Sequence, residues 1–210
     1  MTLPRFYPVL DTATLARRGC PADRVAEAIL DAGAGILQFR HKGNFSGSIF
    51  RQLERAARLC HDTGALLVVN DRADVARMLG AGLHLGQQDL PPRHARSLMG
   101  AECVIGFSTH NREQIEAAAN EPVDYVAIGP VFSTSSKDKP DPVLGVDAIR
   151  ELRGLTTRPL VAIGGITREN ARAVIESGVD SVAVISDLIP ELPLERAIRE
   201  RAVEWLELVG

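Results

Sequence analysis

The sequence has little cysteine and no long apolar run, and each absence excludes a class of protein. Its 210 residues include three cysteines, Cys20, Cys60 and Cys103, without a C-x-x-C pair or a cysteine–histidine ligand spacing. Isolated thiols of this kind are typical of a reducing compartment, so we expect them to be reduced and mostly buried. No apolar run reaches the ~18 residues of a membrane span, and the first residues contain no signal-peptide core. We therefore expect a cytoplasmic protein that does not enter the membrane.

The chain also lacks an excess of positive charge. It carries 24 Lys and Arg against 27 Asp and Glu, a formal net charge of −3 at pH 7. This balance gives no reason to expect binding to nucleic acid or to an anionic membrane surface. Any anionic ligand must therefore be bound by a local group of side chains. Linkers and low-complexity tracts are absent too, and we expect a single domain over residues 1–210.

Short apolar runs alternate with longer amphipathic runs along the whole chain, which predicts an α/β protein with a parallel sheet. The expected strands are Phe6–Leu10, Gly35–Arg40, Leu66–Asn70, Gly82–Leu85, Cys103–Phe107, Tyr125–Ile128, Leu160–Ile163 and Ser181–Val184. The expected helices are Ala22–Ala32, Ser46–Thr63, Asp71–Leu79, Pro91–Met99, Arg112–Asn120, Val146–Arg153, Arg168–Ser177 and Leu194–Val209. Eight such units suit a TIM (β/α)8 barrel. A doubly wound open sheet is the alternative, weakened because no glycine-rich dinucleotide fingerprint follows the first strand.

In a barrel of this kind the chemistry lies where the strands end. The second expected strand ends in Gln38, Arg40 and Lys42, which strand alternation directs to one face, with Phe39 and His41 on the other. Two cations and an amide on one face form an anion-binding row. The alternative is a strand end with ordinary surface cations.

Carboxylates follow the next two strands. Asp71 comes directly after the third strand, and Asp89 follows the fourth. Each could cap a helix or close a turn. Together, beside a cationic row, they favour a divalent cation, and Mg²⁺ suits oxygen ligands and substrate phosphates best.

The later strand ends are rich in hydroxyls and glycine. Ser108 follows the fifth strand and can donate to a phosphate, while His110 is either an acid/base or a residue that packs near a helix start, which we favour. Gly164-Gly165 follows the seventh strand, where backbone N–H groups often bind phosphate; a tight turn is the alternative.

The loop from Gly129 to Pro140, after the sixth strand, is the longest of these segments. It carries hydroxyls, including Thr134 and Ser136, and the lysine Lys137, which are groups that hold a phosphate or diphosphate. A solvated surface loop is the alternative. Taken with the other strand ends, the pattern indicates two anion sites and no Ser-His-Asp set, which favours chemistry driven by a leaving group that the protein stabilises by charge and positioning.

Several motifs in chain order resemble those of the thiamine-phosphate synthase family, and the resemblance covers nearly the whole chain. They are Gln38-x-Arg40-x-Lys42, Asn70-Asp71-Arg72, His84-x-Gly86-Gln87-x-Asp89, Gly106-x-Ser108-Thr109-His110, Gly129-Pro130-Val131-Phe132-x-Thr134-x-Ser136-Lys137, Ile163-Gly164-Gly165-Ile166 and Val184-Ile185-Ser186. Two positions depart from the commonest pattern. Ser136 stands where threonine is usual, and His41 where glutamate is frequent.

The resemblance implies a TIM-barrel transferase of thiamine biosynthesis that uses Mg²⁺. Such an enzyme joins a hydroxymethylpyrimidine diphosphate to the nitrogen of hydroxyethylthiazole phosphate, carboxylated or not, and releases diphosphate. It implies catalytic roles for Arg40, Lys42, Ser108 and Lys137. It also implies that Asp71 and Asp89 bind the metal, and that the substrates are held by Gln38, Arg40, Lys42, Asn70, Ser108, Thr134, Ser136, Lys137, Gly165, Ile185 and Ser186.

There are two rival functions, and the first belongs to an isomerase that shares this fold. A thiazole tautomerase would need an acid/base, for which His110 is available, but it would have less need of both aspartates and the cationic row. A non-catalytic regulator that binds thiazole phosphate would be expected to lack Asp71, Asp89 or Lys137, and all three are present. The partners that we expect are small-molecule substrates. The oligomeric state stays open, with a homodimer as one option.

Overall fold

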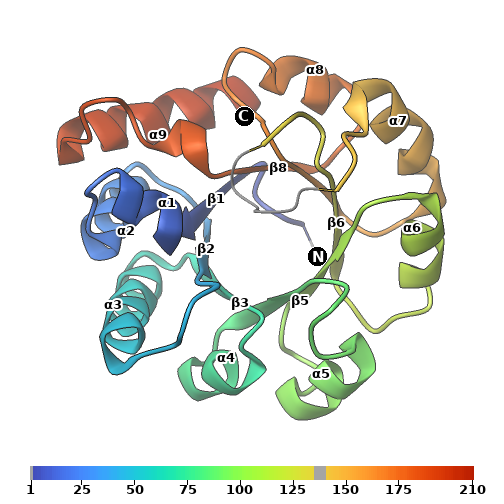
Figure 1. Cartoon of the computed structure of the whole chain (residues 1–210), viewed down its shortest axis with the longest axis horizontal. Helices are drawn as coiled ribbons and strands as arrows, with labels where there is room; N and C mark the ends of the chain where they lie inside the picture. The colour runs from blue at the N-terminus through green and yellow to red at the C-terminus, as the bar shows by residue number, and fades with distance from the viewer. Residues whose placement is uncertain (1, 135–140) are drawn as a thin grey trace.

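The computed structural model of the chain describes residues 2–134 and 141–210, and it contains a closed barrel of eight parallel strands in chain order (Figure 1). The strands are β1 (Phe6–Asp11), β2 (Ile36–Arg40), β3 (Leu66–Asn70), β4 (Gly82–Leu85), β5 (Ile105–Thr109), β6 (Tyr125–Ile128), β7 (Leu160–Ile163) and β8 (Ser181–Val184). Closure comes from the pairing of β1 with β8, for example Tyr7 with Ala183. The TIM-barrel prediction is confirmed, and the open-sheet alternative is wrong.

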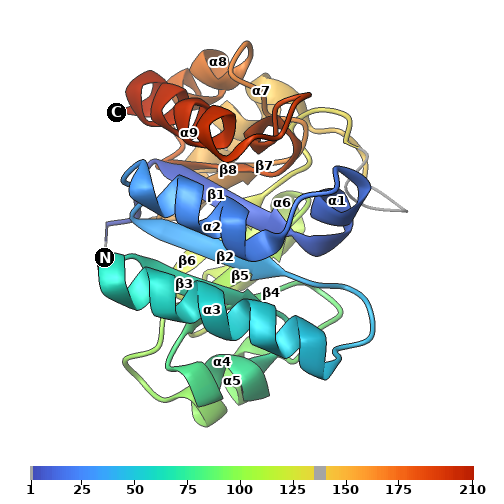
Figure 2. The same ribbon diagram turned by 90° about the vertical axis from the view of Figure 1, so that its left-hand side faces the viewer.

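Helices surround the barrel on all sides (Figure 1). They are α1 (Thr12–Arg17), α2 (Ala22–Asp31), α3 (Gly47–Thr63), α4 (Ala73–Leu79), α5 (Pro92–Met99), α6 (Arg112–Ala118), α7 (Gly145–Leu152), α8 (Ala171–Glu176) and α9 (Glu195–Val209). Two short 3-10 helices, η1 (Arg153–Leu155) and η2 (Ser186–Leu188), complete the secondary structure of the described residues. On one flank α9, α2 and α3 lie side by side (Figure 2).

Several element bounds differ by one to three residues from the sequence-based expectation, and the differences at β5, β1 and α1 affect the site. Strand β5 begins two residues later than expected and continues through Ser108 and Thr109, which pair with Ala127 and Ile128 of β6. Strand β1 extends to Asp11, whose carboxylate caps the unexpected helix α1 by accepting from the Thr14 backbone N–H at 2.8 Å. A helix of six residues is too short to show a periodic apolar pattern, and this explains why α1 was missed.

The apolar side chains form two layers. Inside the barrel lie Tyr7, Val9, Ile36, Val68 and others of alternate strand positions. Between the strands and the helices lies a larger cluster that includes Phe6 and the fully buried Trp205, whose rings stack 5.8 Å apart. Strands that are buried on both faces explain the nearly continuous apolar runs in the sequence.

The end of the barrel where the strands begin is closed by arginines that bind backbone. Arg96 donates to the carbonyl oxygens of Pro122 and Cys103 and to the Asp124 carboxylate, which also accepts from the Ile105 N–H. Arg153 and Asp180 repeat this arrangement at β7 and β8. These contacts stabilise the closed end and leave the opposite end for binding.

Candidate active site at the strand C-termini

The upper interior of the barrel is lined by the last inward-facing side chains of successive strands. Each of these side chains lies on the same face of its strand as the residue two positions earlier, which also faces the barrel interior, because side chains alternate along a strand. On the first five strands these side chains are polar: Asp11, Arg40, Asn70, His84 and Ser108. On β6, β7 and β8 the corresponding side chains are apolar or small. The two halves of the barrel mouth therefore differ in chemistry.

Arg40 forms a nearly buried ion pair. Its guanidinium donates to the carboxylate of Asp11, with the two side chains 13% and 3% exposed. Asp11 also accepts from the backbone and hydroxyl of Thr14. The carboxylate thus holds Arg40 at the barrel mouth with one charge already compensated, and sequence reasoning missed Asp11 entirely. Its position two residues beyond Val9, on the inward face of β1, is the signal that could have found it.

Lys42 lies at the rim, where its ammonium donates to Asp71 at 2.6 Å. The Lys42 side chain is half exposed. In the same region Asn70 Nδ2 and Asp71 Oδ1 are buried atoms that have no hydrogen-bond partner among the described residues. Buried polar atoms without a partner are costly, so this part of the barrel mouth is a candidate for contact with a ligand.

Asp71 does not cap helix α4. The capping alternative is wrong because the N-cap is Arg72 and α4 begins at Ala73. Asp71 instead adopts a left-handed backbone with φ of 65°, the one non-glycine residue of the described chain that does so. A side chain in this conformation is strained, and such residues concentrate at functional sites.

Asp89 supplies a second carboxylate beside Asp71. One Asp89 oxygen accepts from the Gly86 N–H at 2.7 Å and closes the turn after β4, so the turn alternative holds for one of its oxygens. Burial, followed by the neighbouring Asp89, raises the pKa of Asp71 to about 6, although Lys42 opposes the shift. The described residues contain no group of three or more His, Cys, Asp or Glu that could together hold a metal ion. The donor set is thus one pair of carboxylates, which fits a cation that takes its other ligands from water and substrate.

Gln38 and Ser108 are joined through the barrel interior by hydrogen bonds. Gln38 donates to the Tyr7 hydroxyl at 3.0 Å, and Ser108 contacts His84 Nε2 at 2.8 Å. The hydroxyls of Tyr7 and Tyr125 lie between them. The sequence placed Gln38, Arg40 and Lys42 on one face, and the first two face the barrel interior. It did not identify the tyrosines, which look like ordinary core residues.

A cavity of about 220 Å³ lies across the mouth from Asp71, between the ends of β6, β7 and β8. Four residues that were expected to bind a monophosphate line it together: Thr134, Gly165, Ile185 and Ser186. Sequence reasoning missed other polar residues of the lining, Ser133, Thr167 and Asp187. They follow the expected strands by three to five residues, in segments that periodicity does not describe.

Gly165 brings two loops of this cavity into close contact. A Cβ atom at Gly165 would lie 2.4 Å from the Ser133 carbonyl oxygen, and one at Gly164 would lie 2.6 Å from Pro130 Cα. Both glycines have positive φ, 103° and 64° in chain order. The glycines are thus required where the loop after β7 approaches the loop after β6, and this contact shapes the cavity wall.

His110 is bound by neighbouring loops. Its Nδ1 lies 2.6 Å from the Gly129 carbonyl oxygen, and its Nε2 lies 3.5 Å from Asp141. Asn111 caps helix α6 by accepting from Gln114. His110 thus links the loop after β5 to the segment after β6, which agrees with the packing interpretation. Ser136 and Lys137, expected at the thiazole phosphate and the diphosphate, lie outside the described residues.

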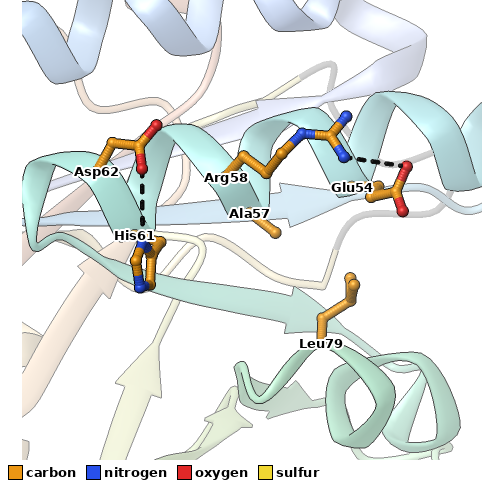
Figure 3. A pocket seen from close by; sticks show the side chains of 6 residues that line it. All are labelled: Glu54, Ala57, Arg58, His61, Asp62 and Leu79. Carbon is orange, nitrogen blue, oxygen red and sulfur yellow. Dashed lines mark hydrogen bonds and ion pairs between the residues drawn. The ribbon is translucent and has the colours of Figure 1, made fainter.

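A larger hollow, of about 320 Å³, lies on the outer surface between α3 and α4 (Figure 3). Its charged side chains bind one another in the pairs Arg58–Glu54 and His61–Asp62. These residues belong to the second half of α3, which leads back toward the start of β3. The groove is therefore remote from the strand C-termini and has no role in the site.

Comparisons with known proteins bear on the whole chain. Residues 6–188 match the family model described as thiamine monophosphate synthase. The thiamine-phosphate synthase of Koribacter versatilis is 44% identical over 100% of this chain and 97% of its own length, and that of Chlorobium phaeovibrioides is 43% identical over 86% and 88%. Among solved structures, thiamine phosphate pyrophosphorylase from Pyrococcus furiosus matches with a TM-score of 0.83 at 30% identity, covering 98% and 95% of the two chains.

Proposed function

The chain belongs to the thiamine monophosphate synthase family, and we propose that it is a transferase that couples a hydroxymethylpyrimidine diphosphate to hydroxyethylthiazole phosphate in thiamine biosynthesis. The observation that carries this proposal is the division of the barrel mouth. Cations and a pair of carboxylates lie at the ends of β2, β3 and β4. A cavity lined by hydroxyl groups and glycine lies between the ends of β6, β7 and β8. Two different phosphorylated substrates can then meet across one mouth.

The reaction breaks the bond between the pyrimidine methylene carbon and the diphosphate oxygen. The electron pair leaves with the diphosphate, and the lone pair of the thiazole nitrogen forms the new carbon–nitrogen bond. The step that needs help is the build-up of negative charge on the departing diphosphate. Arg40 and Lys42 are the described cations at that end of the mouth, and we assign them, with Lys137, to stabilise that charge. Gln38, Asn70 and Ser108 are proposed to hold the pyrimidine diphosphate.

Asp71 and Asp89 are the residues that would hold Mg²⁺. When bound, this ion would neutralise charge on the diphosphate. The fit is supported by the buried Asp71 Oδ1 without a described partner and by the raised pKa of Asp71, which a cation would reverse. The Lys42 ammonium donates to one carboxylate oxygen of Asp71. A bound diphosphate would offer Lys42 an alternative partner.

The thiazole phosphate is assigned to the cavity between the ends of β6, β7 and β8. Thr134 and Ser136 would contact the phosphate, and Gly165, Ile185 and Ser186 would supply its backbone surroundings. This assignment is supported by the shared lining of Thr134, Gly165, Ile185 and Ser186. We propose further that residues 1–210 act as one catalytic unit, because strands from the whole length of the chain contribute to a single mouth.

Two further features, the helices and the cysteine thiols, bear on where in the cell the protein works. No helix in residues 2–134 and 141–210 is long and apolar enough to cross a membrane. The three cysteines are free thiols, and burial raises the pKa of Cys60 to about 12. We propose that the protein works in the cytoplasm, where such thiols stay reduced.

The decisive experiment mixes the purified protein with both phosphorylated precursors and Mg²⁺ and measures diphosphate and thiamine phosphate. Stoichiometric formation of both is expected, with loss of turnover in EDTA and recovery on adding Mg²⁺. Absence of diphosphate release would refute the proposal. Isomerisation of the thiazole without coupling would support the tautomerase instead.

Variants test the residue assignments. Asp71→Ala and Lys137→Ala are expected to abolish nearly all coupling at saturating substrates while the circular dichroism spectrum stays unchanged. Lys139→Ala is the matched control for Lys137, because it removes a lysine two positions away to which we assign no role. Full turnover by Asp71→Ala or Lys137→Ala would refute the site assignment.

A further inference from the structure

A continuous series of hydrogen bonds crosses the barrel interior between Gln38 and Ser108, two residues assigned above to the pyrimidine diphosphate. Gln38 Nε2 donates to the Tyr7 hydroxyl at 3.0 Å, and the Tyr7 and Tyr125 hydroxyls are 2.7 Å apart. The Tyr125 hydroxyl lies 3.0 Å from His84 Nδ1, and His84 Nε2 lies 2.8 Å from Ser108 Oγ. We call this series the Gln38–Ser108 chain. It joins β2 to β5 through side chains of β1, β6 and β4.

One direction lets every hydroxyl of the Gln38–Ser108 chain donate within the series. The amide nitrogen of Gln38 donates to Tyr7, and in this direction Tyr7 donates to Tyr125. Tyr125 in turn uses its proton on His84 Nδ1, which leaves the imidazole hydrogen on Nε2, facing Ser108. Ser108 then accepts from His84, and its own hydroxyl hydrogen remains for a ligand.

Both phenols keep the protons that this direction requires. Burial raises the pKa of Tyr7 to about 12, and burial with the neighbouring Tyr7 raises the pKa of Tyr125 well above the ordinary value for tyrosine. Each hydroxyl therefore offers one hydrogen to the next member of the series.

Packing holds the rings of the series in place. The Tyr125 ring stacks on the His84 ring with centroids 5.6 Å apart, and it meets the Tyr7 ring edge to face at 6.0 Å. Gly106 makes the room, because a Cβ at this position would lie 2.0 Å from Tyr125 Cζ. Phenylalanine at positions 7 and 125 would fill the same space. Ring packing therefore does not account for the two hydroxyls, and their role in the series is hydrogen bonding.

We propose that Tyr7, Tyr125 and His84 are positioning residues that hold Ser108 as a hydrogen-bond donor, and Gln38 with its carbonyl oxygen as the remaining acceptor, toward the pyrimidine diphosphate. The inference rests on the proposed function for the identity of that ligand. It adds a specificity rule to the site. The bound group must offer an acceptor to Ser108 and a donor to Gln38. A ligand with the reverse pattern would leave both buried groups unpaired.

The kinetic test uses Tyr125→Phe, which removes one hydroxyl and keeps the ring. We expect kcat/KM for the pyrimidine diphosphate to fall about 10-fold or more, since a buried hydrogen bond is lost, while KM for the thiazole phosphate changes less than about twofold because that substrate is assigned to the opposite half of the mouth. The double variant Tyr125→Phe with Ser108→Ala should be no slower than Ser108→Ala alone. Kinetics of Tyr125→Phe like those of the unchanged protein, or fully additive losses in the double variant, would overturn the proposal.

Ser181→Ala is the matched control. It also removes a buried hydroxyl, one that donates to the Pro4 carbonyl oxygen at 2.7 Å at the closed end of the barrel. It should lower the melting temperature without changing either KM. A rise in KM for the pyrimidine diphosphate as large as in Tyr125→Phe would show that any lost interior hydroxyl has this effect, and would overturn the proposal.

A second test does not depend on catalysis. Long-range ¹⁵N–¹H NMR at pH 7.5 on the substrate-free protein identifies the tautomer of each histidine, and His84→Gln assigns the His84 signals. The expected result is hydrogen on Nε2 in the unchanged protein and a mixture of tautomers in Tyr125→Phe. Hydrogen on Nδ1 would overturn the inference even in a fully active synthase. Absence of diphosphate release with the Nε2–H tautomer would refute the proposed function alone.

Discussion

Replacing Asp71 by asparagine is expected to stabilise the substrate-free protein at neutral pH and to remove its activity. Asparagine suits the position because it tolerates the left-handed backbone that Asp71 adopts, with φ of 65°. The variant therefore changes the charge without adding backbone strain, and its effect on stability reports the electrostatic cost of the site.

The magnitude follows from the pKa of Asp71. Burial and Asp89 raise it from 3.8 to about 6, and the side chain is 19% exposed. A shift of this size corresponds to about 3 kcal/mol of free energy of unfolding at pH 7. Lys42 opposes the shift, so the pKa of about 6 and the free energy worked from it already include the Lys42 pair. The net gain in Asp71→Asn is then about 3 kcal/mol, roughly 6–12 °C in Tm for a chain of this length.

The sign of this stability difference can be checked by varying the pH. A raised carboxyl pKa means that the folded protein binds the proton more tightly than the unfolded chain. The unchanged protein should therefore lose stability as pH rises from about 4 to about 6, relative to Asp71→Asn. Below that window the two proteins should be nearly equally stable, and above it the difference should be constant.

The assay is urea unfolding in EDTA at several pH values between 4.5 and 7.5. Asp74→Asn is the control of opposite sign, because the hydrogen bond from Arg72 lowers the pKa of the exposed Asp74. It should be less stable than the unchanged protein at pH 7. A stability difference between Asp71→Asn and the unchanged protein that does not vary with pH, or a less stable Asp71→Asn at pH 7.5, would refute the reasoning.

Three further variants, one of them with a second glycine variant as its control, address other parts of the structure. Asp11→Asn should lower the free energy of unfolding by ~3 kcal/mol, because it leaves the nearly buried Arg40 without its carboxylate; added inorganic diphosphate should raise the Tm of this variant more than that of the unchanged protein. Gly165→Ala should raise KM for the thiazole phosphate, because its Cβ would meet a carbonyl oxygen at 2.4 Å, whereas Gly80→Ala, with nearly the same φ and open space around it, should cost about 1 kcal/mol without a kinetic change. Arg96→Gln should cost ~3 kcal/mol and leave both KM values unchanged, since its contacts lie at the closed end of the barrel.

Each of these expectations has a contrary outcome. A Tm of Asp11→Asn that responds to diphosphate no more than that of the unchanged protein would mean that Arg40 does not face the ligand. Equal kinetic effects of the two glycine variants would refute the role of the contact between loops. A change in either KM in Arg96→Gln would show that the closed end influences the mouth.

The alternation of short apolar runs with amphipathic runs was enough to predict the eight strands and the barrel. Strands buried on both faces must be apolar throughout, and this signal is local in the sequence. Strand alternation likewise predicted that Gln38 and Arg40 share one face. The missed helix α1 depends on side-chain capping, and the extension of β5 to Thr109 depends on pairing with β6, which a single stretch of sequence does not reveal.

The sequence by itself determined the fold class, the family and the residue types present at each strand end. The tertiary structure decided which of these residues form ion pairs and hydrogen bonds with one another. Asp11 meets Arg40 because β1 and β2 pair with these two residues opposite each other, and Tyr7 meets Tyr125 because barrel closure brings inward-facing residues of β1 and β6 together. Such contacts join residues far apart in the chain, and their energies depend on burial that exists only after the barrel has closed.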